Sequence, residues 1–383
     1  MFSHDNSGNH SISDSCFAVL QLSQIKGLGL KNFHLLYNYF CSPKKILDAS
    51  YEEIVKSGIK PKLAQIICEY LADKKHIENP YFERLLEWSD KKNNYVICLD
   101  DELYPKSLKE TYAPPPILYL QGQINAFEFD SLAVIGSRRP TLAGQKNAIR
   151  FSRQLAEMGF CITSGLAIGI DTYAHKGAVD AQGVSCAVLG SGLENIYPKQ
   201  NQKLALAIQE RGLLISELAL DVNAMPANFP RRNRVISGLS KGVIVVEAGL
   251  KSGSLITADF AIEQNREVFA IPGSIDNPLS KGGHALIKQG AVLVDDVNDI
   301  VGLLGQQCPS QKLGCPSDQP AKVDYSHLSN DEQRVISVLG SESTSFDDLV
   351  HCLGIDVGEL NNLLVMLELK GEVSAVAGGY QKI

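Results

Sequence analysis

The sequence predicts an α/β protein with a parallel sheet covered by helices on both faces, placed between a small helical domain and a C-terminal winged helix. From Tyr95 to about Leu304, short apolar runs alternate with helical patterns, as is typical of such a sheet. Before this region apolar positions recur at helical spacing, and after it three helical patterns lead into a hairpin. A chain of 383 residues is long enough for two or three domains.

Seven segments of the central region are predicted to be strands. The run from Val243 to Val246 is continuously apolar, which indicates a strand covered on both faces. The seven segments are Leu132–Ile135, Phe160–Thr163, Val184–Leu189, Leu213–Ile215, Gly242–Val246, Glu267–Ile271 and Ala291–Val294. The preceding segment from Tyr104 to Gly122 is rich in proline, which disfavours helix, so it is predicted to cross the sheet edge as extended chain.

Pattern and composition divide the chain into five parts. Residues 1–15 are expected to be a disordered tail, residues 16–85 a helical domain and residues 86–304 the sheet domain. Residues 305–325 have the polar, Pro- and Gly-punctuated composition of a linker, and residues 326–383 are expected to form the winged helix.

In the helical domain, Gly27 and Gly29 separate the first two helical patterns. A Gly-x-Gly at this place resembles the helix-hairpin-helix turn, whose backbone amides can hold a DNA phosphate. An ordinary turn between two helices is the alternative.

The C-terminal module is expected to contain three helices and a wing. The helices are Ser329–Leu339, one that starts at Ser345 with Asp348 as its capping-box partner, and Val357–Leu369, and the wing is a hairpin over Val373–Gln381 that turns at Gly378–Gly379. The third helix has Lys370 as its only cation, whereas phosphate binding needs cations. The sequence therefore favours a protein-interaction or structural role for this module.

The charge is distributed unevenly along the chain. The formal net charge is −7 and the isoelectric point about 5.7, and most of the net negative charge, −6, lies in the C-terminal module. Two windows of the sheet domain contain cations and no carboxylate. One holds Arg231, Arg232, Arg234 and Lys241, and the other holds Arg138, Arg139, Lys146, Arg150 and Arg153. Such local patches can bind polyanions even on an acidic protein.

The nine cysteines are scattered and form no Cys-x-x-Cys pair, which suits a reducing cytoplasm. No apolar run approaches the roughly 18 residues of a membrane span, and the first residues lack the basic-then-apolar order of a signal peptide. We therefore expect a cytoplasmic protein that does not enter a membrane.

Glycine-rich turns follow several of the predicted strands. These turns are Gly136–Arg138, Ser164–His175, Gly190–Asn201 and Glu247–Ser254. Ligands of open α/β sheets bind outside the carboxyl ends of the strands, so the turns are expected to share one edge. Backbone amides at helix N-termini and arginine side chains suit phosphate, and the predicted ligand is an anion. Asp171 is expected to cap a helix or to form structural hydrogen bonds, and His175 to pack within a helix.

Other site chemistries have little support in the sequence. Gly190–Asn195 begins like a dinucleotide motif but has Asn at the third glycine, and no acidic residue follows the second strand to hold a ribose. The sequence has no His-Glu-x-x-His motif or clustered Cys/His set for a metal, and no Gly-x-Ser-x-Gly nucleophile turn. No cofactor, no metal and no catalytic residue are predicted.

Six motifs, in this order, resemble the DprA (Smf) family of DNA-processing proteins. They are GSRRPT (136–141), SGLAIGIDTYAH (164–175), LGSGLENIYPKQN (189–201), FPRRNRVISGLS (229–240), EAGLKSGSLITA (247–258) and IPGS (271–274). The resemblance spans essentially the whole chain. It implies a SAM-like N-terminal helical domain, an extended Rossmann core and a C-terminal winged helix.

The resemblance further implies a homodimer that binds single-stranded DNA without sequence preference, protects incoming DNA and loads the RecA recombinase during natural transformation, with no catalysis. Arg138 and Lys199 match phosphate-contacting positions of the family, and Phe229 matches an aromatic that can stack on a base. The implied DNA-binding residues are Gly136, Ser137, Arg138, Gly165, Lys199, Phe229, Arg231, Asn233, Arg234, Gly249, Ser252 and Gly253. A structural network for Asn233 and Arg234, and core packing for Phe229, are the alternatives.

The alternative function is enzymatic. The core also resembles the lysine-decarboxylase-like nucleotide phosphoribohydrolases, whose PGGxGTxxE turn corresponds to EAGLKSGSLIT here. Thr257 stands where that family has its catalytic Glu, and without this carboxylate the glycosidic bond lacks its acid/base partner. Glu217 and Glu247 are nearby carboxylates that keep this alternative open.

Overall fold

The computed structural model describes residues 12–73, 79–304, 328–339, 344–376 and 379–382. The chain divides into two units, Met1–Pro309 and Ser310–Ile383. The linker expected at 305–325 and residues 1–11 of the expected tail lie outside the described residues.

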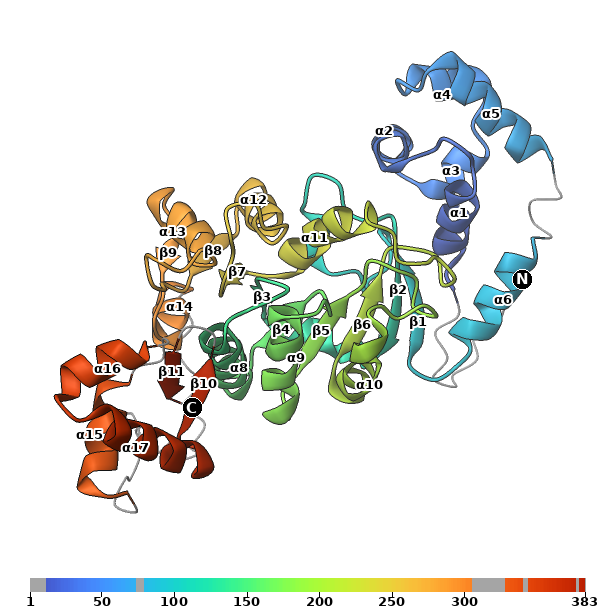
Figure 1. The fold of residues 1–383 in the computed structure, drawn as a ribbon. Coiled ribbons are helices and arrows are strands. Elements are labelled where there is room, and N and C mark those ends of the chain that lie inside the picture. The colour runs from blue at the N-terminus through green and yellow to red at the C-terminus, as the bar shows by residue number, and fades with distance from the viewer. Residues whose placement is uncertain (1–11, 74–78, 305–327, 340–343, 377–378, 383) are drawn as a thin grey trace. The chain divides into compact units, whose positions relative to one another are not determined.

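The larger unit is built on a sheet that, over the described residues, has nine strands in the order β1-β2-β6-β5-β4-β3-β7-β8-β9 (Figure 1). The strands are β1 (Asn94–Cys98), β2 (Ile117–Gly122), β3 (Ser131–Ile135), β4 (Cys161–Ser164), β5 (Ser185–Val188), β6 (Leu213–Ser216), β7 (Gly242–Val245), β8 (Glu267–Ala270) and β9 (Val292–Leu293). The strands from β6 to β9 in this order are parallel to one another. From β3 the chain builds β4 to β6 on one side and then returns to add β7 on the other, so the strand order reverses beside β3.

All seven predicted strands are present, and they correspond to β3 to β9. Strand β1 was not predicted, and the segment before β3 was expected only as extended chain that crosses the sheet edge. There, β2 pairs antiparallel with both β1 and β6, and Lys106–Lys109 forms one helical turn. Because β2 is buried along nearly its whole length, its sequence lacks the alternation of apolar and polar residues that is typical of a half-buried strand.

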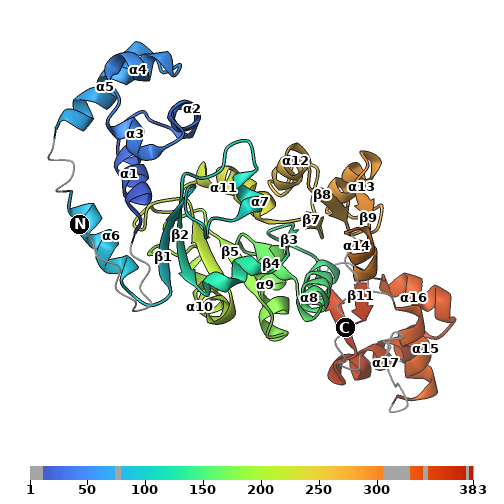
Figure 2. The same ribbon diagram turned by 180° about the vertical axis from the view of Figure 1, so that it is seen from behind.

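Helices cover both faces of the sheet. In the larger unit after β1 they are α7 (Lys106–Lys109), α8 (Leu142–Glu157), α9 (Ile170–Asp180), α10 (Gln202–Arg211), α11 (Asn228–Leu239), α12 (Leu255–Glu263), α13 (Lys281–Lys288) and α14 (Val297–Leu303), with short 3-10 helices at Ile124–Glu128 and Lys199–Asn201. Alternate residues of β3 enter two cores: Leu132 and Val134 pack with α8 and α9, and Ala133 and Ile135 belong to the core that includes α11 and α12. Figures 1 and 2 show these two helix pairs on opposite faces.

The N-terminal region is helical, as predicted. Its helices are α1 (Asp14–Ser23), α2 (Leu30–Phe40), α3 (Pro43–Leu47), α4 (Tyr51–Lys56), α5 (Pro61–Ala72) and α6 (Pro80–Ser89). Two helices cross the expected boundaries. Helix α1 begins inside the expected tail because Ser13 caps it, and α6 runs across the expected division between residues 85 and 86. The turn between α1 and α2 contains Gly27, with φ of 90°, and Gly29, the N-cap of α2.

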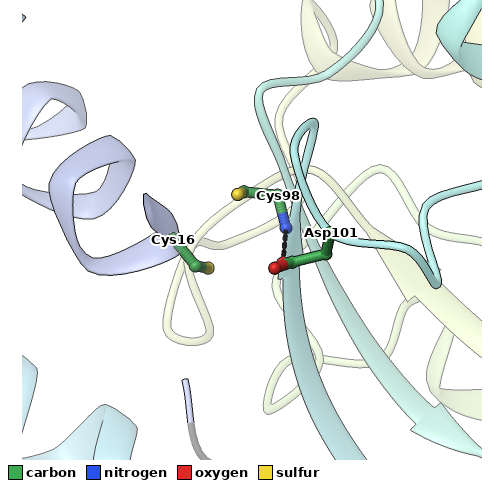
Figure 3. A group of neighbouring side chains, drawn as sticks. All are labelled: Cys16, Cys98 and Asp101. Atoms are coloured by element: carbon green, nitrogen blue, oxygen red, sulfur yellow. Dashed lines mark hydrogen bonds between the residues drawn. The ribbon is translucent and has the colours of Figure 1, made fainter. Parts of the chain in front are cut away.

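Helix α1 meets β1 at a cluster in which Cys16 lies beside Cys98 and Asp101, which are distant from it in sequence (Figure 3). The Asp101 carboxylate accepts hydrogen bonds from the Cys98 amide at 2.6 Å and from the Ser13 hydroxyl at 2.8 Å. The Cys16 thiol donates to the Val96 carbonyl at 3.7 Å, and the neighbouring Cys98 thiol together with burial raises the pKa of Cys16 well above its ordinary value. Cys16 is therefore a neutral, packed thiol that helps to hold the helical region on the sheet.

The smaller unit contains the three helices and two-stranded wing that the sequence predicted. They are α15 (Asn330–Val338), α16 (Phe346–Leu353), α17 (Val357–Leu369), β10 (Val373–Val376) and β11 (Gly379–Lys382). The Ser345 hydroxyl accepts from the Asp348 amide and donates to its carboxylate at 2.6 Å, so the expected pair forms the cap without the full reciprocal box. Gly379 is the first residue of β11, and Gly378 lies outside the described residues.

Across the described ranges, no single helix is both long and apolar enough to cross a membrane. Helices α16 and α17, which are bent by 112° relative to each other, reach that threshold together on length and composition only.

Candidate functional site

A cavity of about 700 Å³ opens outside the carboxyl ends of β3 and β7. This is where the strand order reverses, the usual ligand position in open α/β sheets. Its wall consists of Ile135, Gly136, Arg138, Ala167, Asp171, Tyr197, Ala224, Pro226, Phe229, Pro230, Arg232, Asn233, Ile236, Ser252, Gly253, Ser254, Ile256 and Thr257. The prediction that the glycine-rich turns share one edge is confirmed for all four, after β3, β4, β5 and β7, because each contributes to this wall, the turn after β5 through Tyr197.

Phe229 lies in the first turn of α11, and its ring is half-buried. The guanidinium carbons of Arg138 and Arg232 lie 5.5 and 6.0 Å from the ring centroid, and the Tyr197 ring lies 6.0 Å away. A Cβ on Gly190 would stand 2.9 Å from the ring, so the turn after β5 needs glycine to make room for Phe229. The aromatic ring is thus held beside two cations at the cavity wall.

Arg232 forms part of the wall although it is only 4% exposed. Its Nη1 donates to the Gly165 carbonyl at 2.6 Å and to the Val188 carbonyl, while its Nε has no hydrogen-bond partner. Burial lowers the pKa of Arg232 to about 10, and the charge of Asp171 opposes this shift. The guanidinium therefore stays charged at neutral pH and places a fixed cation at the base of the cavity.

The predicted site did not include Arg232, which appeared only as one charge of a basic window. A signal for it exists in the sequence. Arg232 follows Phe229 by three residues on a predicted helix, and residues three apart share a helix face.

Internal carboxylates occupy two of the glycine-rich turns. Glu247, at the end of β7, accepts from the amide and the hydroxyl of Thr141, the N-cap of α8. Asp171 accepts from the amides of Gly165 and Ala167 at 3.1 and 3.3 Å. Glu247 therefore takes up the amide and the hydroxyl of the N-cap residue of α8, next to the turn after β3 where phosphate was expected at a helix N-terminus. The expectation of structural hydrogen bonds for Asp171 is confirmed, although the N-cap of α9 is Gly169.

In contrast to those two turns, the turn before α12 leaves a backbone amide available. A Cβ on Gly253 would have no atom within 4 Å, and the side chain of Asn233 donates to the Gly253 carbonyl at 3.3 Å. Among the hydrogen bonds of the described residues, none uses the Gly253 amide. This turn therefore has backbone available to a ligand at the N-terminus of a nine-residue helix.

His175 supports the turn after β4 from beneath, and the prediction that it packs within the protein is confirmed. It is fully buried, and its Nε2 accepts from the Leu166 amide at 3.3 Å, so the proton is on Nδ1 and is donated to the Ser185 hydroxyl at 2.8 Å. Burial lowers the pKa of His175 to about 3, which keeps the ring neutral. Asn201 adds a hydrogen bond to the Leu166 carbonyl at 2.9 Å.

Most cations of the two basic windows are already engaged. Arg234 pairs with Glu217 and donates to the Ala113 carbonyl at 2.5 Å, and Arg231 pairs with Glu217 at 3.1 Å. Lys241 pairs with Asp130 at 2.7 Å and Arg153 with Asp180 at 3.7 Å. For Arg234, with a side chain only 11% exposed, the structural network that the sequence left open is the observed arrangement.

The predicted site residues therefore separate into three groups. The cavity wall contains Gly136, Arg138, Phe229, Asn233, Ser252 and Gly253. Ser137, Gly165, Lys199 and Gly249 belong to the surrounding turns but not to the wall, and Lys199 is exposed at the start of a 3-10 helix two residues after Tyr197. Arg231 and Arg234 lie outside the wall and bind Glu217.

Two family models match this chain. The model described as "DNA recombination-mediator protein A" matches residues 95–305, and the one described as "DprA winged helix domain" matches residues 319–379. The chain is 43% identical over 308 residues to protein Smf of Escherichia coli K12. This match covers 79% of this chain and 80% of that protein. It is 44% identical over 278 residues to DNA processing protein DprA of Streptococcus pneumoniae, covering 67% of this chain and 98% of that protein.

Two solved structures are similar to this one. The X-ray structure of DprA from Streptococcus pneumoniae has a TM-score of 0.65 and 34% identity, covering 75% of this chain and 97% of that chain. A structure of DNA processing protein A from Helicobacter pylori, described in terms of that protein's single-stranded DNA binding mode, has a TM-score of 0.50 and 30% identity. It covers 55% of this chain and 95% of that chain.

Replacing Gly165 by Ala is expected to destabilise the protein, because the added Cβ would overlap the Arg232 guanidinium. Overfilling a packed interior costs about 1–3 kcal/mol, and each kcal/mol lowers the melting temperature of a large domain by about 2–4 °C. Gly253→Ala is the matched control and should have the same melting temperature as the wild type, since the added Cβ has free space. Equal melting of Gly165→Ala and wild type in thermal unfolding would show that Arg232 is not held as described.

Proposed function

The chain belongs to the DNA recombination-mediator protein A family, whose members process DNA for recombination, and on this premise we propose that it binds single-stranded DNA without sequence preference. The strand would lie along the cavity outside β3 and β7, with Phe229 as its stacking surface. In this proposal the protein protects incoming DNA and loads the RecA recombinase onto it during natural transformation or recombination.

The observation that carries the proposal is the Phe229 ring held beside two guanidinium groups. Binding of single strands without sequence readout needs cations along a groove and an aromatic face, since every base can stack. The cavity wall supplies both. The described binding mode of the Helicobacter pylori relative supports the same ligand for this chain.

Phosphate contacts are assigned to groups that the fold leaves unpaired. Arg138 is exposed on the wall, Lys199 is exposed beside it, and the Gly253 amide is available at the start of α12. Asn233 and Ser252 complete the polar lining. Gly136, Ser137, Gly165 and Gly249 are assigned to shaping the turns, whereas Arg231 and Arg234 hold Glu217 in place.

A nucleotide-hydrolysing role has less support from the site. Thr257 is buried in the wall where the phosphoribohydrolases have their catalytic Glu, and Glu217 and Glu247 are held by the arginine pair and by Thr141. Among the described wall residues the single carboxylate is Asp171, which two backbone amides occupy. The arrangement therefore supports binding rather than hydrolysis.

The RecA recombinase and a second copy of the chain are proposed as protein partners on the basis of family membership alone. Because the proposed ligand is DNA, we propose that the protein acts in the cytoplasm. The seven cysteines in the described residues are free thiols, which fits a reducing compartment.

Replacing Arg138 or Lys199 by Ala should weaken binding to oligothymidylate and flatten its salt dependence. Each lost phosphate contact lowers the slope of log affinity against log salt by about 0.7 for single strands. Fluorescence anisotropy over a salt series measures both quantities. Arg150→Ala is the control, because Arg150 lies outside the cavity wall and donates to the Asp295 carbonyl. Wild-type affinity and slope in both site variants would contradict the assignment.

Replacing Phe229 by Leu should weaken oligothymidylate binding by about 1–3 kcal/mol, or roughly 5- to 150-fold, because a stacked base loses its partner. The salt slope should stay unchanged, since no cation is removed. Phe229→Tyr keeps an aromatic face and should retain most of the affinity. Phe129, 40% exposed in a different cavity, provides the control Phe129→Leu. Equal affinities of the wild type and Phe229→Leu would place the strand elsewhere.

Incubation with nucleoside monophosphates should release no free base above the uncatalysed rate, because the cavity lacks an available carboxylate. Chromatography of the products over time measures this. A Thr257→Glu variant tests the same point from the other side, since it restores the acidic residue type of the hydrolases. Base release by the wild type at an enzymatic rate would overturn the binding proposal in favour of the phosphoribohydrolase class.

A further inference from the structure

Helix α17 of the winged-helix unit is apolar on two opposite sides. Leu360, Leu364 and Leu367 are fully buried and form the core of the unit together with α15 and α16. Val365 and Met366 are each 48% exposed, and Leu369 is 78% exposed. The exposed side chains are thus large and apolar although nothing in the described unit covers them.

Helix geometry places these exposed residues together. At about 100° per residue, Val365, Met366 and Leu369 fall within one sector that points away from the buried leucines, and the exposed Asn362 lies in the same sector one turn earlier, so the apolar sector belongs to the C-terminal half of the helix. We call this sector, defined by Val365, Met366 and Leu369, the outer face of α17. A helix that is apolar on both sides is normally covered on both sides, so we expect a partner to cover the outer face.

The charge around the outer face is negative. Glu359 and Glu368 are exposed on α17 itself, and Asp356 is its N-cap. Lys370, which follows the helix, binds Glu332 at 2.7 Å. In the described part of the unit the other two cations also have partners: Arg334 contacts Asp331 at 3.7 Å, and Lys382 is engaged as well.

These charges indicate which of three ligands fits the outer face: DNA, a second copy of the chain or another protein. Duplex or single-stranded DNA needs cations that are free to meet phosphates, and the described unit offers no lysine or arginine without a partner. A second copy packed on the same face would bring Glu359 and Glu368 of both copies together as like charges. A protein segment with basic side chains beside an apolar stripe would instead be complementary.

We propose that the outer face of α17 docks an amphipathic segment of another protein, apolar along its contact face and carrying lysine or arginine on its flanks. The apolar residues Val365, Met366 and Leu369 supply the contact, and Glu359 and Glu368 orient the basic flanks. This inference goes beyond the DNA-binding role and does not depend on it, because the outer face belongs to the separate C-terminal unit.

The test uses the full chain and two synthetic helical peptides with the same leucine stripe, one flanked by lysines and the other by glutamates. Fluorescence anisotropy should show binding of the lysine peptide and at least about 10-fold weaker binding of the glutamate peptide. Met366→Gln with Leu369→Gln should weaken the lysine peptide about 10-fold or more. Glu359→Gln with Glu368→Gln should weaken it and reduce its salt dependence. Each variant should unfold thermally like the wild type, since the residues are exposed.

Val357→Gln is the matched control. Val357 is 57% exposed at the start of α17 but lies outside the outer face, so this variant should bind the lysine peptide like the wild type. Equal binding of both peptides, or an unchanged affinity in Met366→Gln with Leu369→Gln, would overturn the proposal. Loss of oligothymidylate or duplex affinity in that double variant would instead make the outer face a DNA contact. A change in its sedimentation would make it a contact between copies.

Discussion

The buried guanidinium of Arg232 is the interaction on which the candidate site depends. It ties α11 to the carbonyls at the ends of β4 and β5 and lies over the Phe229 ring. Burying a charge costs several kcal/mol unless hydrogen bonds and an opposite charge offset the loss of water. Here two carbonyls and the charge of Asp171 provide that offset. Gly165 has to be glycine because any Cβ there would overlap the guanidinium.

The same site shows that the number of basic residues in a motif differs from the number of cations that remain available to a ligand. Glu217 binds two arginines of the FPRRNR motif, and Glu247 and Asp171 take up backbone amides that a phosphate would otherwise use. Of the predicted site residues, the fold leaves available the side chains of Arg138 and Lys199, the Gly253 amide and the half-buried Phe229 ring. A preorganised site of this kind gains its affinity from position rather than from net charge.

Much of the fold followed from local patterns. The runs around Leu132 and Val243 are continuously apolar because parallel strands are buried on both faces, and this signal located β3 to β9. The strand β1 was missed, because the antiparallel edge of the sheet is defined by pairing with β2 rather than by its own pattern. The start of α1 was misplaced because the Ser13 cap lies in a polar stretch that resembles a tail. For the site, the glycine turns and Phe229 were found, but Arg232 was not.

The fold class, the family and the edge of the sheet at which the cavity opens could all be predicted from the sequence, because periodicity, glycine turns and ordered motifs are local properties. The sequence also determined that the C-terminal unit is poor in cations, which is a property of composition. Which arginines face the cavity and which bind Glu217 became clear from the folded structure, because ion pairing depends on distances between segments far apart in the chain. For the same reason the folded structure alone exposed an apolar outer face on α17, since burial of one side of a helix is decided by what packs against it.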